Sequence, residues 1–150
     1  MTVVRKFHPE VRLKKMLSEP GGLKISQALE RAVGNLEEIK EDCLLAIDGK
    51  IAQLAVLFEK GGEDELERSY YVANEIFAEA GAFDLKEVSA AAHSLCVLLS
   101  ADDLTALPKA ALAVHVDTLR ALRSQALSGD AKTRGVVLAQ LQAMTAKLTG

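Results

Sequence analysis

The sequence predicts an all-α protein, folded as an up-and-down antiparallel helical bundle with a long N-terminal helix. Hydrophobic residues make up 49% of the 150 residues, and Ala and Leu, both good helix formers, supply most of them. Apolar residues recur at steps of three and four, whereas no segment alternates with a period of two. Short loops separate the successive helical segments, which favours antiparallel neighbours.

The first expected helix runs from Ser26 to Lys60, after a break at "EPGG", residues 19–22. This break separates a basic N-terminal arm (1–22) from a single helical-bundle domain (23–150). At about 1.5 Å per residue the helix reaches roughly 50 Å, which four shorter helices cannot cover along its whole length. We therefore expect a homodimer through its uncovered flank. The apolar stripe of this helix is Leu29, Ala32, Leu36, Ile39, Cys43, Ile47, Ile51, Leu54 and Phe58.

The second and third expected helices lie on either side of a turn near residue 83. The second covers residues 63–81, and Gly81 is expected at the C′ position that ends it. For the third, Asp84 is expected to cap the N-terminus, with Glu87 three residues on completing a capping box. The third helix is expected to bury Leu85, Val88, Ala92, Leu95 and Leu99.

Two further helices are expected in the last third of the chain. Pro108 fits only the first turn of the fourth, and "SGD", residues 128–130, ends it. Asp130 is expected to cap the fifth. The fourth helix carries Leu112, Val116, Leu119, Leu122 and Ala126, and the fifth carries Val137, Leu138, Leu141, Met144 and Leu148.

Composition excludes several classes of function. A net charge of −3 gives no general attraction for nucleic acid, and no run of about 20 apolar residues predicts membrane insertion. The start of the chain lacks the apolar region of a secretory signal. Cys43 and Cys96 form no C-x-x-C pair and predict reduced thiols, hence a cytoplasmic protein. The basic residues of the N-terminal arm are interpreted as a solvated terminus in preference to a docking arm: Arg5, Lys6, Arg12, Lys14 and Lys15.

Autonomous catalytic, metal and cofactor sites are not predicted. His8, His93 and His115 are scattered, without a spacing that places two metal ligands on one helical face. Ser94 and Ser100 lie near His93, but no nucleophile elbow accompanies them. No phosphate-binding loop is present. His115 lies beside an apolar stripe and is interpreted as a packed histidine.

His93 differs from the other histidines in its position on the third helix. It lies off the apolar stripe, with small neighbours at Ala90 and Ser94. The neutral form of an imidazole has a free ring nitrogen that can accept a phosphoryl group. The alternative is an ordinary surface histidine. The supporting face around His93 is taken as Lys86, Ser89, Ala90, Ser94, Cys96 and Val97.

The stretch "FDLKEVSAAAHSLCVLLS" resembles the phosphorylated helix of histidine-containing phosphotransfer (Hpt) domains, whose pattern is A-H-x-L-K-G. Ala92, His93, Ser94 and Leu95 match, while Cys96 and Val97 stand where the family has Lys and Gly. The resemblance implies a four-helix core in which His93 carries a phosphoryl group to and from response-regulator receiver domains. The receiver supplies Mg²⁺, so the chain has no cofactor of its own and is at most a phosphoryl carrier.

A second resemblance runs through the N-terminal half. The segments "VRKF", "PGG" and "ALERAVGNLEEIKEDCLLAID" are similar to the CheE family of small alphaproteobacterial chemotaxis proteins. It implies a role in chemotaxis or two-component signal transduction, with a receiver domain or a histidine kinase as partner. Two interpretations stay open: a phosphorelay carrier that uses His93, or a non-catalytic adaptor whose phosphorylation site has degenerated. A structural bundle with no link to signalling is a third.

Overall fold

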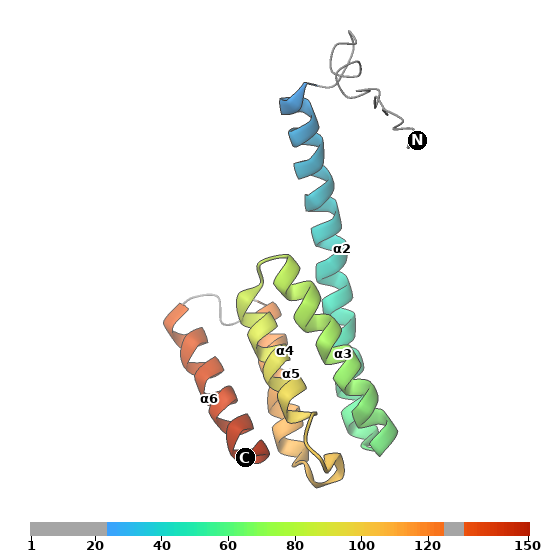
Figure 1. Ribbon diagram of the computed structural model, residues 1–150, viewed down its shortest axis with the longest axis vertical. Helices are drawn as coiled ribbons and strands as arrows, with labels where there is room; N and C mark the ends of the chain where they lie inside the picture. Colours follow the sequence, from blue (N-terminus) through green and yellow to red (C-terminus); the bar gives the residue numbers. More distant parts are fainter. Residues whose placement is uncertain (1–23, 125–130) are drawn as a thin grey trace, which may run out of the picture. The chain divides into compact units, whose positions relative to one another are not determined.

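A computed structural model describes residues 24–124 and 131–150, and over these residues the protein is helical with no strand. In chain order the elements are α2 (Ile25–Lys60), α3 (Glu63–Ala82), α4 (Lys86–Leu98), a 3₁₀ turn η1 (Leu104–Ala106), α5 (Lys109–Arg123) and α6 (Ala131–Thr149). From α3 to α6 each helix runs opposite to the one before it (Figure 1). The predicted all-α class and up-and-down order are therefore confirmed.

The chain divides into two compact units, residues 1–38 and 39–150, with the boundary inside α2. Of the predicted features, the basic arm (1–22), Ala126 and the break at residues 128–130 lie outside the described residues. The domain boundary at residue 22 stays a prediction.

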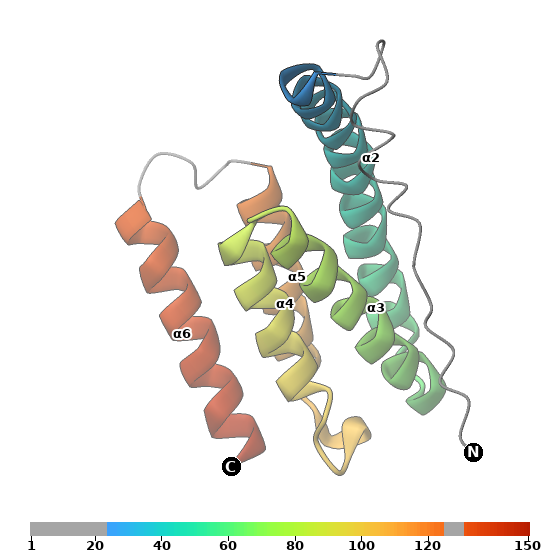
Figure 2. The same ribbon diagram turned by 45° about the horizontal axis from the view of Figure 1, so that its top comes forward.

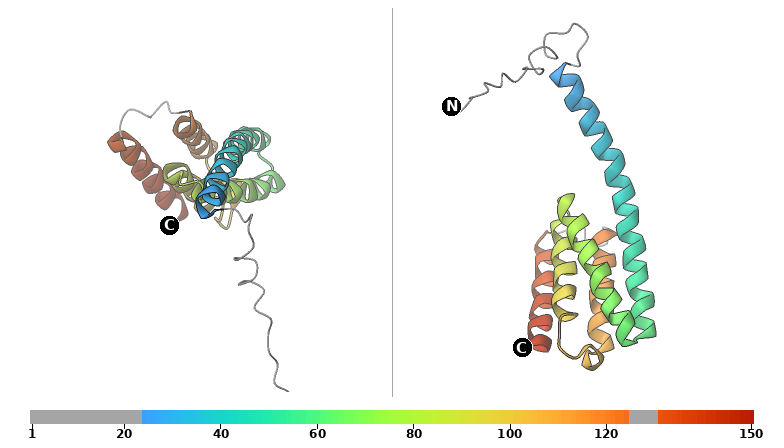
Figure 3. Two further views of the ribbon diagram at one scale, coloured as in Figure 1. Left: turned by 90° about the horizontal axis from the view of Figure 1, so that it is seen from above. Right: turned by 45° about the vertical axis from the view of Figure 1, so that its right-hand side comes forward.

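Helix α4 occupies the centre of the second unit and packs against α3, α5 and α6. Figures 2 and 3 show it between α3 and α6, with α5 along a third side. Burial of large aliphatic side chains, worth about 2 kcal/mol each, holds these helices together. The fully buried ones are Ile47 and Leu54 of α2, Ile76 of α3, Leu95 and Leu98 of α4 and Leu119 of α5.

Ion pairs connect α2 to its two neighbours within the second unit. Arg123 of α5 donates two hydrogen bonds of 2.9 Å to the carboxylate of Asp48. Lys50 pairs with Glu75 and Glu79 of α3. Burial by itself lowers the pKa of Lys50, but its hydrogen bonds to the two carboxylates outweigh that effect and the pKa is raised. Lys50 therefore stays charged.

The turn between α3 and α4 differs from the sequence prediction. Gly81 lies inside α3, and Asp84 is the residue in the left-handed region, with a φ of 59°. Leu85 N–H donates to the Ala80 carbonyl at 2.8 Å, and Asp84 N–H donates to the Gly81 carbonyl at 3.3 Å. These are the two bonds of a Schellman motif with Asp84 at C′. The expected role of Asp84 as the N-cap of α4 is therefore wrong, because its backbone belongs to the turn that ends α3.

Helix α4 consequently begins without a side-chain cap, and Leu85 precedes its first residue. Glu87, the expected second member of the capping box, accepts a hydrogen bond of 3.2 Å from Arg134 of α6 instead. Pro108 lies directly before the first residue of α5. The expected stripe of α6 is wrong at Leu148, which is 37% exposed, whereas Thr145 is buried. None of the described helices is long and apolar enough to cross a membrane.

Candidate functional site

Helix α4 reaches the surface along one narrow stripe, which contains His93. Most of the α4 side chains are buried, because three other helices pack around it. The exposed residues fall three, four or seven positions apart, as expected of one helical face. We call this the His93 stripe: Lys86, half-buried Ala90, His93, Val97 and, just after the helix, Ser100.

Phe77 of α3 holds the imidazole of His93 from one side. The two ring centroids are 5.4 Å apart, with an angle of 49° between the ring planes. Sequence reasoning missed Phe77, since 16 positions separate it from His93. The antiparallel hairpin of α3 and α4 explains the contact, because the two helices pack side by side and bring residues from before and after the turn together. The ring is thus exposed to solvent but restricted in its rotamers.

Three residues of the predicted supporting face lie away from the His93 stripe. Ser89 is buried and its hydroxyl donates to the Phe77 carbonyl at 3.0 Å. Ser94 is buried among α5 and α6. Cys96 is 7% exposed. Neighbours in sequence differ by about 100° around a helix, so only the packing of α3 and α6 decides which of them stays accessible. Lys86, Ala90 and Val97 do share the stripe with His93.

Cys96 is part of the buried hydrophobic core and is only 7% exposed. Burial raises the pKa of its thiol to about 11. The thiol is therefore protonated at neutral pH and is neither a nucleophile nor a source of charge for an anion bound at His93. Lys86, two turns from His93, forms an ion pair with Asp84 at 3.3 Å.

A hollow of about 470 Å³ opens at the C-terminal end of the His93 stripe. Val97 and Ser100 line one side of it and Leu148 of α6 lines another. Asp102 and Asp103 lie on its rim, and hydrogen bonds from Thr105 and Ala106 lower the pKa of Asp103. The hollow lies one turn from His93 along the stripe, and the two aspartates make it acidic.

His115, expected to be packed, is fully buried between α4, α5 and α6. Its Nδ1 donates to the Ala111 carbonyl at 2.8 Å, which leaves Nε2 as an acceptor. The hydroxyls of Ser94 and Thr145 lie 3.3 and 3.2 Å from Nε2 and 2.8 Å from each other. This polar cluster connects three helices, and nothing in the sequence pattern identified its hydroxyl members. Burial lowers the pKa of His115.

The stability of the protein is expected to fall as the pH drops below about 6.5, the pKa of histidine in an unfolded chain. Because the folded state has the lower His115 pKa, the unfolded state binds the proton first, at a cost of up to about 1.4 kcal/mol per pH unit. In His115→Leu the two hydroxyls can bond to each other, and Thr145 can still donate to the Leu141 carbonyl. Urea unfolding at pH 7, 6 and 5 should show a smaller pH dependence for this variant. An unchanged slope would contradict this role of His115.

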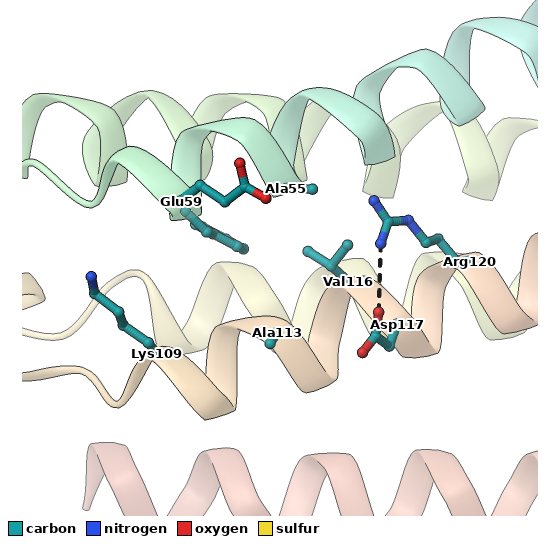
Figure 4. A pocket seen from close by; sticks show the side chains of 8 residues that line it. Ala55, Glu59, Lys109, Ala113, Val116, Asp117 and Arg120 are labelled. Carbon is teal, nitrogen blue, oxygen red and sulfur yellow. Dashed lines mark ion pairs between the residues drawn. The ribbon is translucent and has the colours of Figure 1, made fainter.

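A second hollow, of about 300 Å³, lies between α2 and α5 (Figure 4). Ala55, Ala113 and Val116 form much of its wall, and facing alanines leave space because their side chains are short. Arg120 at one end is paired with Asp117 at 3.5 Å. Glu59 and Lys109 also line the hollow.

Over residues 24–124 and 131–150, no group of three or more His, Cys, Asp or Glu side chains could hold a metal ion. The exposed chemistry of the site is therefore that of one restrained imidazole on the His93 stripe. Comparison of the chain with protein-family models, with curated proteins and with solved structures finds no match.

Proposed function

We propose that this protein is a phosphoryl carrier of a two-component or chemotaxis pathway, which accepts a phosphoryl group on His93 from a receiver domain and passes it on. One observation carries the proposal. Helix α4 is covered on its other sides, and its uncovered stripe presents the imidazole of His93 to solvent beside Phe77. A partner protein can therefore reach the ring without any rearrangement of the bundle.

The chemistry requires little from this chain. A neutral ring nitrogen of His93 attacks the phosphorus of a receiver aspartyl phosphate; the new N–P bond forms as the P–O bond to the aspartyl carboxylate breaks. The receiver contributes the Mg²⁺ that neutralises the phosphoryl oxygens. The reverse transfer returns the group to a second receiver. Phe77 supports the reaction by limiting the rotamers of the ring before the partner arrives.

The wider context is also a proposal, supported by the two sequence resemblances. In it an Hpt-like four-helix core lies within residues 39–150, and the protein is cytoplasmic and related to CheE. Its partners are a receiver domain, a histidine kinase or both. The up-and-down order of the helices is compatible with that core.

A second candidate function is an adaptor that docks receivers or a kinase without accepting a phosphoryl group. Two observations favour it. Cys96 is buried and uncharged, so it cannot replace the lysine that neutralises the phosphate in the family. Val97 is 39% exposed beside His93, where the family has glycine and a docked receiver needs space. The acidic hollow beside Val97 would serve either function as part of the docking surface.

The deciding experiment is phosphotransfer from receiver domains of the source organism, each charged with ³²P-labelled acetyl phosphate. For the carrier we expect label on this chain that is lost in acid and retained in alkali, as for a phosphoramidate. Mass spectrometry should then place it on the peptide containing His93. Buried His115 serves as the internal control, since it must stay unlabelled.

The two candidates give different results in one assay. A receiver that binds the chain but transfers no label would overturn the carrier and support the adaptor. If no receiver labels or binds the chain and no histidine kinase of the organism binds it, both proposals fail.

A further inference from the structure

The N-terminal part of α2 carries an apolar seam with a coiled-coil spacing. Its steps of four, three, four and three residues follow the 3.5-residue period of a heptad repeat. Large side chains of the seam are strongly exposed: Ile25 is 81% exposed and Leu29 60%. We define the seam as Ile25, Leu29, Ala32, Leu36 and Ile39.

An exposed seam of this kind requires a partner helix. The seam is the first part of the 36-residue helix α2, and most helical stability in proteins comes from packing of an apolar face. On the partner helix, apolar residues must also recur every 3.5 residues and form a stripe as narrow as the seam. A second copy of the same segment satisfies both conditions, because a two-fold axis makes one surface complementary to itself.

Charge decides how the two copies are oriented. Lys40 is outnumbered by Glu38, Glu41 and Asp42 at the C-terminal end of the seam. Lys24 and Arg31 outnumber Glu30 at its N-terminal end. A parallel pair sets the two acidic ends side by side, whereas an antiparallel pair sets each acidic end beside a basic one. Within about 10 Å, such charges attract measurably in ordinary buffer.

We infer that this protein forms a homodimer through an antiparallel coiled coil of the seam, with the two-fold axis passing near Gly34. In this register Leu29 faces Ile39 of the second copy, and Ala32 faces Leu36 of the second copy. Each small residue is thus opposite a large one, which lets the two helices pack closely. The inference is independent of the proposed function of His93, which lies on α4.

Light scattering tests the dimer with two matched variants of α2. The wild-type chain at tens of micromolar should have twice the 16.1 kDa mass of one chain. Leu36→Glu should halve that mass, because it buries a charge in the seam. Leu45→Glu is the control: Leu45 is 70% exposed on the opposite side of α2, so this variant should stay dimeric. A monomeric wild-type chain, or a dimeric Leu36→Glu variant, would overturn the inference.

Disulfide trapping tests the orientation, in a chain with Cys43→Ala and Cys96→Ala. The double variant Leu29→Cys, Ile39→Cys should form a covalent dimer on mild oxidation, while each single variant should not. In the antiparallel register two copies of position 29 are about 15 Å apart along the axis, too far for a disulfide. Positions 29 and 39 of one helix are equally far apart, so no bridge forms within a chain. Covalent dimers of the single variants would show a parallel pair and overturn this register.

Discussion

Substitution of His93 by glutamine is expected to abolish phosphoryl transfer to this chain while the free energy of unfolding changes by no more than about 0.5 kcal/mol. Glutamine keeps the polarity and approximate reach of histidine but has no nucleophilic ring nitrogen. The ring of His93 is exposed, and its contact with Phe77 is the one interaction that the substitution removes. Urea unfolding and the ³²P transfer assay measure the two effects separately.

His115→Leu is the matched control for this variant. It removes a histidine from the interior of the same bundle, so it should lose no label as long as the chain stays folded. Two results would contradict the expectation. A His93→Gln chain that is destabilised by 2 kcal/mol or more would show that the ring is structural, and one that still takes label would place the acceptor elsewhere.

The second large expected effect is a loss of stability when Cys96 is replaced by the lysine of the Hpt pattern. From the sequence, Cys96→Lys together with Val97→Gly is expected to speed transfer by restoring that pattern. The structure contradicts this for position 96, because Cys96 is 7% exposed in an apolar environment. Cys96→Lys alone is expected to cost on the order of 3 kcal/mol, since the ammonium loses its water without gaining a partner. The melting temperature should fall by roughly 10 to 15 °C.

Val97→Lys is the control that places the same charge on the surface. Val97 is exposed on the His93 stripe, four positions after the imidazole, and lysine is a better helix former than valine. Stability should therefore change by less than about 0.5 kcal/mol. If His93 accepts a phosphoryl group, a charge-assisted contact worth about 1 kcal/mol should raise the transfer rate roughly fivefold. Calorimetry that finds Cys96→Lys as stable as Val97→Lys would refute the buried environment of residue 96.

The sequence by itself determined the helices and, in α4 and α5, the sides on which they are buried. A period of 3.6 identifies residues that share a face, so Leu95 of α4 and Leu119 of α5 were correctly expected in the core. The packed state of His115 followed from the same argument. Helix ends were less predictable: the pattern of Asp84 and Glu87 suits a capping box, yet the tight turn places Asp84 in the left-handed region of a Schellman motif.

The tertiary structure decided which faces are covered. Ser94 follows His93 directly in the sequence, but α5 and α6 enclose Ser94 while no helix covers His93. Phe77 became a neighbour of His93 only through the hairpin of α3 and α4. Periodicity reports the direction of each side chain around its own helix axis. It contains no information on which other helix lies in that direction, because that depends on contacts between residues far apart in the chain.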